Sequence, residues 1–257
     1  ESAYGYMEWL LNQYIHHTRR KVWEPLSEMF PLRQEGYLML IRINKQHLIL
    51  NEEMKREIGY FIKKHLIDTS SITFQVNGTE NLLAVLALSG SRIEQEQITQ
   101  IEEFIQNILV LEKNRIYFAV SSLYPDMESC GNKAYEEAMA AMKYSFYEEE
   151  RYLQAEKYLS DEKQEDSVGS EAILNSIKEG NLEKSEAIFE KITEVLSEHK
   201  SVQPDIFKRK IVFFFFRILR YMEPYLKAEH LSELNALDNR LIESQWYSEL
   251  KKRSAEL

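Results

Sequence analysis

Apolar side chains in residues 1–30 recur every three or four positions, the spacing that places them along one face of a helix. We therefore expect a helix here, ended by the prolines and the glycine that follow it. Its apolar face is rich in tyrosine and consists of Tyr4, Met7, Leu11, Tyr14 and Thr18. Two interpretations remain open. The helix lies on its own domain, or it pairs with a second copy as a short parallel coiled coil that joins this region to an upstream domain.

From residue 36 the pattern alternates between segments of strand length and segments of helix length. Apolar runs or period-two alternation predict four strands, at 37–43, 71–76, 82–88 and 115–121. Three-four spacing predicts three helices, at 54–66, 94–111 and 134–145. The pair Asn77-Gly78 is typical of a hairpin turn between the second and third strands. The order predicts an α+β fold class, a split β-α-β-β-α-β arrangement with one antiparallel sheet and helices on a face.

The polar stretch 160–167 predicts a solvated linker and a domain boundary. We expect three regions: an N-terminal linker helix at 1–35, the α+β domain at 36–159 and a helical bundle at 160–257. Four segments of the bundle have helical spacing: 170–178, 182–196, 205–222 and 231–250. The run 211–216 is typical of a helix buried on several sides, and an aromatic face for dimer contact is the alternative.

Composition and charge narrow the class of function. At 257 residues and 44% apolar, the chain is long enough for genuine cores. Apolar runs such as 211–216 are far shorter than the roughly 20 residues that cross a bilayer. A single cysteine, Cys130, favours a reducing compartment, so we expect a cytoplasmic protein. The net charge of −10, with scattered basic residues, argues against direct DNA binding by this chain.

Titratable residues do not form a pattern that predicts catalysis or metal binding. The six histidines lack ligand spacing, and Cys130 lies near a helix start without a partner base in the sequence. The stretch 77–80 could contact phosphate, but a single glycine is weak support for that, and hairpin turn chemistry explains the stretch fully. We expect no catalytic residue, no metal and no cofactor. Because the chain begins at Glu1 and has no signal-peptide pattern, we also expect it to be part of a longer protein.

The strand and helix order from 37 to 121, followed by Ala134-Tyr135-Glu136-Glu137-Ala138-Met139-Ala140-Ala141, resembles the GGDEF-like middle domain of bacterial AraC-type transcriptional regulators. The stretch 173–183 is similar to the helical segment that follows this domain in the response-regulator members. PucR-type and sugar-diacid regulators have a similar domain, so the type of regulator stays open. The resemblance implies a region of a two-component system that lies between an upstream receiver or membrane sensor and a downstream pair of helix-turn-helix motifs. It also implies a homodimer, with Tyr4, Met7, Leu11 and Tyr14 as possible contacts.

The catalytic relatives of this fold, diguanylate cyclases, hold magnesium with carboxylates. Where they have Asp-x-Asp after the first strand, this chain has Arg42-Ile43-Asn44, and Arg42 places a positive charge where a cation should bind. The cyclase hairpin motif corresponds to Gly78, Thr79, Glu80, Asn81 and Leu82. Glu80 alone does not make a magnesium site. The resemblance therefore predicts a non-catalytic regulatory module, with a nucleotide-binding or cyclase-like enzyme domain as the alternative.

Overall fold

The structure is a computed structural model, and it describes residues 3–16, 20–44, 50–65, 70–79, 81–110, 116–147, 150–159, 175–176, 178–180, 183–184, 187–188, 190–191, 203–222, 224, 244 and 247–255. The chain divides into two compact units. The first consists of Glu1–Met142 with Glu150–Ser160, and the second of Lys143–Glu149 with Asp161–Leu257. The sequence predicted a boundary near residue 160, but it did not indicate that residues 143–149 group with the helical unit.

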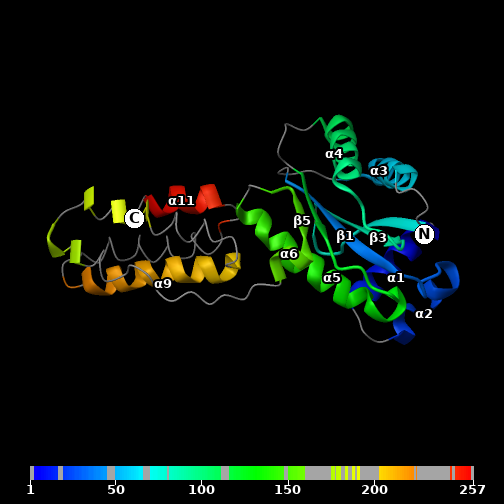
Figure 1. Ribbon diagram of the computed structural model, residues 1–257, viewed down its shortest axis with the longest axis horizontal. Helices are drawn as coiled ribbons and strands as arrows, with labels where there is room; N and C mark the ends of the chain where they lie inside the picture. The colour runs from blue at the N-terminus through cyan, green and yellow to red at the C-terminus, as the bar shows by residue number, and fades with distance from the viewer. Residues whose placement is uncertain are drawn as a thin grey trace. The chain divides into compact units, whose positions relative to one another are not determined.

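A five-stranded open sheet forms the centre of the first unit (Figure 1). Its strands, in spatial order, are β2 (Ser70–Gln75), β3 (Leu82–Leu88), β1 (Gly36–Ile43), β4 (Ile116–Val120) and β5 (Tyr152–Gln154). The first four strands pair antiparallel, and they are the four that the sequence predicted. The α+β fold class is confirmed.

The expectation of a wholly antiparallel sheet was wrong, because β5 pairs with β4 in parallel. This strand has only three residues, and only Leu153 in its middle is fully buried. Three residues are too few to show a period-two pattern. The fifth strand was therefore missed.

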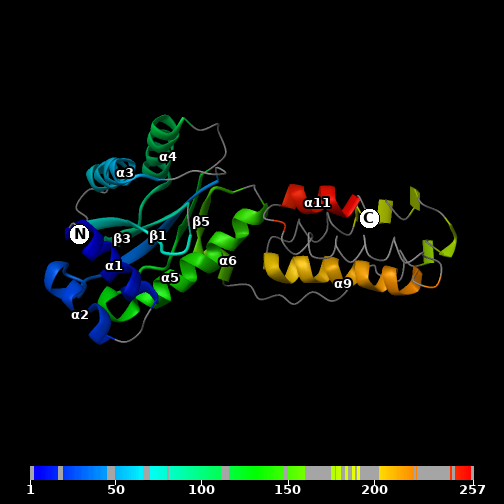
Figure 2. The same ribbon diagram turned by 180° about the vertical axis from the view of Figure 1, so that it is seen from behind.

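Helices cover both faces of the sheet (Figures 1 and 2), rather than the single face that we expected. On one face lie α3 (Glu52–His65) and α4 (Gln95–Leu109), whose Ile58, Ile62, Ile101 and Ile105 share a core with Met39, Ile41 and Ile43 of β1. On the other lie α1 (Ala3–His16), α2 (Arg20–Met29) and α5 (Met127–Lys143). Because both faces are covered, β1, β3 and β4 are buried along almost their whole length, which explains their continuous apolar runs.

Local signals account for the ends of several elements. Gly78 in the β2–β3 turn has φ +78°, a conformation that glycine adopts without strain, so the predicted hairpin is confirmed. Helix α4 starts with a capping box in which Glu94 and Gln97 bond each other's backbone. The single helix expected over residues 1–30 is two helices, α1 and α2, and both belong to the first unit. A short helix, α6 (Ala155–Leu159), follows β5.

The second unit contains α9 (Pro204–Met222), α11 (Tyr247–Ala255) and the short 3-10 helix η1 (Tyr144–Tyr147). The helix expected at 205–222 is confirmed as α9. The predicted linker at 160–167 lies outside the described residues, and so do most of the helices expected at 170–178, 182–196 and 231–250. Within the part of the chain that the structure describes, no helix combines the length and apolar character needed to cross a membrane.

Candidate functional site

The end of β1, at residues 42–44, and the segment that leads into β3, at Asn81 and Leu82, lie together at one end of the sheet. The backbone N–H of Ile43 donates a hydrogen bond of 2.9 Å to the carbonyl oxygen of Asn81. Arg42 lies opposite Leu82 of β3 and opposite Tyr117 of β4. The fold therefore brings the end of β1, with Arg42 and Asn44, beside the strand that follows the Gly78 turn. Glu80 lies outside the described residues.

Arg42 places a guanidinium at this end of the sheet. Its side chain is partly buried, and burial lowers the pKa of the guanidinium while Tyr117 raises it in part. Arginine nevertheless keeps its charge at neutral pH. Among the described residues, no group of three or more His, Cys, Asp or Glu side chains is placed to hold a metal ion. The described side chains at the motif positions, Arg42, Asn44 and Asn81, offer a cation and two amides.

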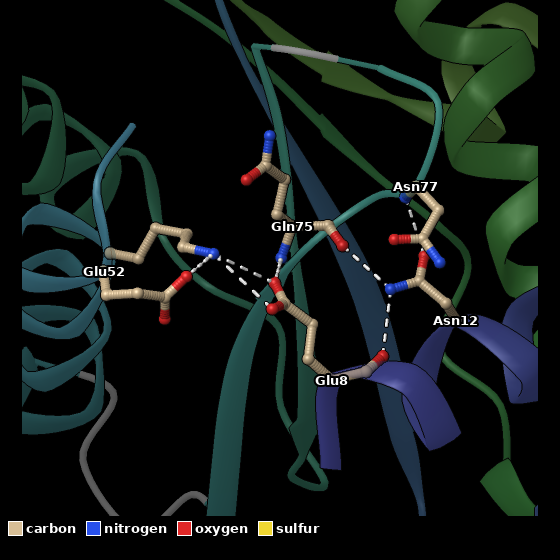
Figure 3. Close-up of polar contacts among 6 residues, drawn as sticks. Glu8, Asn12, Glu52, Gln75 and Asn77 are labelled. Atoms are coloured by element: carbon tan, nitrogen blue, oxygen red, sulfur yellow. Dashed lines mark hydrogen bonds and ion pairs between the residues drawn. The ribbon is translucent and has the colours of Figure 1, made fainter. Parts of the chain in front are cut away.

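A polar cluster joins the N-terminal helix to the neighbouring edge strand (Figure 3). We call it the edge clamp, and its members are Glu8 and Asn12 of α1, Glu52 and Lys55 of α3, Gln75 of β2 and Asn77 of the turn. Strand β2 is at the edge of the sheet, so its outward backbone groups have no neighbouring strand to bond. The edge clamp supplies side-chain partners for the backbone N–H and C=O of Gln75, the last residue of the strand.

Asn12 makes the central contacts of the edge clamp. Its Nδ2 donates to the carbonyl oxygen of Gln75 and to that of Glu8, each at 2.9 Å. Its Oδ1 accepts from the backbone N–H of Asn77 at 2.8 Å. The side chain is 1% exposed, so all of its polar atoms are bonded inside the protein. One amide therefore ties α1 both to β2 and to the turn that leads to Gly78 and Asn81.

Glu8 and Lys55 add a charged part to the edge clamp. Glu8 Oε1 accepts from the backbone N–H of Gln75 at 2.7 Å. The Nζ of Lys55 lies 3.5 Å from both carboxylate oxygens of Glu8 and 2.5 Å from Oε1 of Glu52. Burial by itself lowers the pKa of Lys55, but the carboxylates of Glu52 and Glu8 raise it by a larger amount, so the net shift is upward. A lysine cation thus balances the partly buried carboxylate of Glu8 at neutral pH.

The predicted apolar stripe of α1 faces its own unit. Leu11 is 1% exposed and Tyr14 is 2% exposed, while Met7 is half-buried and the side chain of Tyr4 lies outside the described residues. This burial corresponds to the interpretation in which the helix lies on its own domain. Leu11 and Tyr14 are occupied here, so a dimer seam through them would require α1 to leave the sheet.

Sequence reasoning missed the polar members of the edge clamp. Glu8 and Asn12 are four residues apart on α1, so they lie on the same side of the helix. Asn12 also follows the buried Leu11, and a polar residue among apolar ones was the signal that could have indicated this contact. Lys55 interrupts the buried side of α3 in the same way. Their contacts between different elements join residues 47 to 67 positions apart in the chain, and periodicity cannot pair residues at that separation.

Comparison with known proteins adds no relative. No protein-family model matches the chain, and no curated protein shows significant similarity to it.

Proposed function

We propose that this chain is the non-catalytic signal-relay and dimerisation region of a bacterial AraC-type transcriptional regulator. In this proposal it couples an upstream receiver or sensor domain to a downstream helix-turn-helix domain, and it acts in the cytoplasm as a homodimer. The observed element order, β1-α3-β2-β3-α4-β4-α5, and the spatial order β2-β3-β1-β4 support it, because both agree with the split arrangement that the GGDEF-like resemblance implies.

The observation that carries the proposal is the edge clamp. A relay needs its incoming element bonded to the domain that it controls, and Asn12 bonds α1 to β2 and to the turn at Asn77. In a catalytic relative that turn would present the signature carboxylates. Here it serves as an attachment point for α1, which fits a domain whose hairpin has changed from a catalytic role to a structural one.

Arg42 supports the non-catalytic form of the proposal over a cyclase-like enzyme. A guanidinium in the place of a magnesium ligand repels the cation and cannot coordinate it. Asn44 and Asn81 offer neutral amides in the same region. The described motif positions therefore favour regulation, and the enzyme remains the alternative that the experiments address.

Two experiments test the proposal. The sequence of the encoding gene beyond Leu257 should continue into a pair of helix-turn-helix motifs, and a different class of domain there would overturn the proposal.

In the second experiment, the purified chain incubated with GTP and magnesium should form no cyclic di-GMP above an enzyme-free control. Product formation would instead favour the enzyme alternative.

A further inference from the structure

Helix α5 is bound at its beginning by the N-terminal helix. The phenol of Tyr14 donates a hydrogen bond to the carbonyl oxygen of Met127, and the Nδ2 of Asn132 donates to the carbonyl oxygen of Ile15 at 2.8 Å. Burial raises the pKa of the Tyr14 phenol, so the hydroxyl keeps its proton at neutral pH. Two reciprocal bonds therefore hold the end of α1 against the first turns of α5.

Gly131 makes this approach possible. Glycine is an unfavourable residue inside a helix, yet Gly131 lies within α5 and is buried. A methyl group at this position would overlap the phenol ring of Tyr14. The ring thus fills the space that any other side chain would need, and α1 and α5 interlock at one point.

The other end of α5 continues directly into η1, whose side chains are buried in the second unit. Phe146 and Tyr147 of η1 pack against Phe207 of α9, with ring centroids 6.1 Å and 5.9 Å apart. Tyr147 also lies 6.2 Å from the ring of Tyr247 in α11. Phe207 is fully buried. Helix α5, which contacts α1 at its beginning, is therefore covalently continuous with the aromatic side chains of η1 that pack in the helical unit.

We infer that α5 is the connecting element through which a displacement of α1 reaches the helical unit, with Tyr14 and Gly131 as its entry point and η1 as its exit point. This inference rests on the proposed function, in which α1 carries the incoming signal. A helix of 17 residues is a stiff rod of about 25 Å. Close-packed contacts at both of its ends pass on a displacement because they do not deform freely.

Hydrogen exchange of the whole chain, followed by mass spectrometry, tests the inference. Gly131→Ala should push Tyr14 away from α5. It should accelerate exchange by about fivefold in α1 and also in η1 and the first turns of α9. Glu136→Ala, on the exposed side of the same helix, should leave these rates unchanged. Acceleration confined to α1 and the start of α5, or absent, would overturn the inference.

A second variant makes the experiment decisive if Gly131→Ala alone disturbs folding. Gly131→Ala combined with Tyr14→Leu exchanges the ring for a smaller side chain and leaves room for the methyl group. Exchange in η1 should then return toward the wild-type rate, and acceleration of η1 that persists in a folded double variant would overturn the inference. This measurement involves no DNA and no flanking domain. Its failure would leave the gene-sequence test of the proposed function untouched, and the reverse also holds.

Discussion

Asn12 shows how much can depend on one buried amide. Two of its three hydrogen bonds reach backbone groups outside α1, the carbonyl oxygen of Gln75 in the edge strand and the N–H of Asn77 in the turn, and Asn12 itself is 1% exposed. Removing one partner of a buried hydrogen bond costs more than the bond itself contributes, because the other partner stays desolvated. Asn12 therefore stabilises the fold mainly through its hydrogen bonds to the backbone of Gln75 and Asn77.

The first prediction follows from those two partners. Asn12→Ala should lower the free energy of unfolding of the first unit by about 1–2 kcal/mol, since it removes the bonds to the carbonyl of Gln75 and to the N–H of Asn77. Urea unfolding followed by tryptophan fluorescence measures the change, because Trp23 is buried against Tyr14 with ring centroids 5.3 Å apart. Gln13→Ala on the same helix is the control, and an equal loss in both variants would contradict the prediction.

Lys55 leads to a prediction about pH. The carboxylates of Glu52 and Glu8 raise its pKa in the folded protein above the ordinary value of about 10.4, so its ion pairs contribute fully below that pH. The contribution is lost only as the pH rises through the folded pKa. The difference in unfolding free energy between wild type and Lys55→Met should thus be constant from pH 7 to 9 and shrink at pH 11. A difference that disappears between pH 7 and 9 would show that the ion pairs do not act in this way.

At the scale of elements, the sequence was informative where a pattern is long. Strands β1 and β3 were predicted because each is a continuous apolar run of seven or eight residues, and helix α4 because its apolar residues keep a three-four spacing over 15 residues. The sequence did not predict the short β5, the division of the N-terminal helix into two, or the helices on both faces of the sheet. Each of these depends on which segments meet in space, as does the edge clamp, and a single sequence does not contain that information.

The position of α1 gives the third prediction. Because Leu11 is buried against its own unit, Leu11→Glu should place a carboxylate in an apolar site and lower the thermal midpoint by at least about 5 °C at every protein concentration. Trp9 lies on the exposed side of α1 and is 46% exposed, so Trp9→Glu should change the midpoint little.

The same pair of variants separates a docked helix from a dimer seam. If α1 leaves the sheet to pair with a second copy through Leu11, the effect of Leu11→Glu will depend on protein concentration, and sedimentation will show a dimer that the variant lacks. A docked helix predicts the same sedimentation behaviour for the folded wild type and the folded variant. Calorimetry at two concentrations, with sedimentation alongside, distinguishes the two cases.

For the whole molecule, charge and connectivity matter most. The net charge of −10 repels a polyanion, and the basic run Lys208-Arg209-Lys210 on α9 does not offset it. Lys208 is partly buried with its Nζ 4.9 Å above the ring of Phe146, and burial lowers its pKa although Asp205 and Glu249 act in the opposite direction. One of the three cations thus serves packing in the helical unit, which agrees with the proposal that DNA is bound by a different domain.

The division of the chain into units gives the last prediction. The chain passes between the units after residues 142, 149 and 160, so a cut at the predicted linker leaves η1 attached to the sheet unit without α9 and α11. Phe146 and Tyr147, which are 3% and 7% exposed in the whole chain, would lose Phe207 and Tyr247 as partners. A fragment of residues 1–160 should therefore bind a hydrophobic dye and self-associate at micromolar concentration, because two large rings become exposed together. The same fragment with Phe146→Gln and Tyr147→Gln should stay monomeric and bind little dye. A wild-type fragment that remains monomeric without dye binding would show that the aromatic contacts of η1 are not needed to cover these rings.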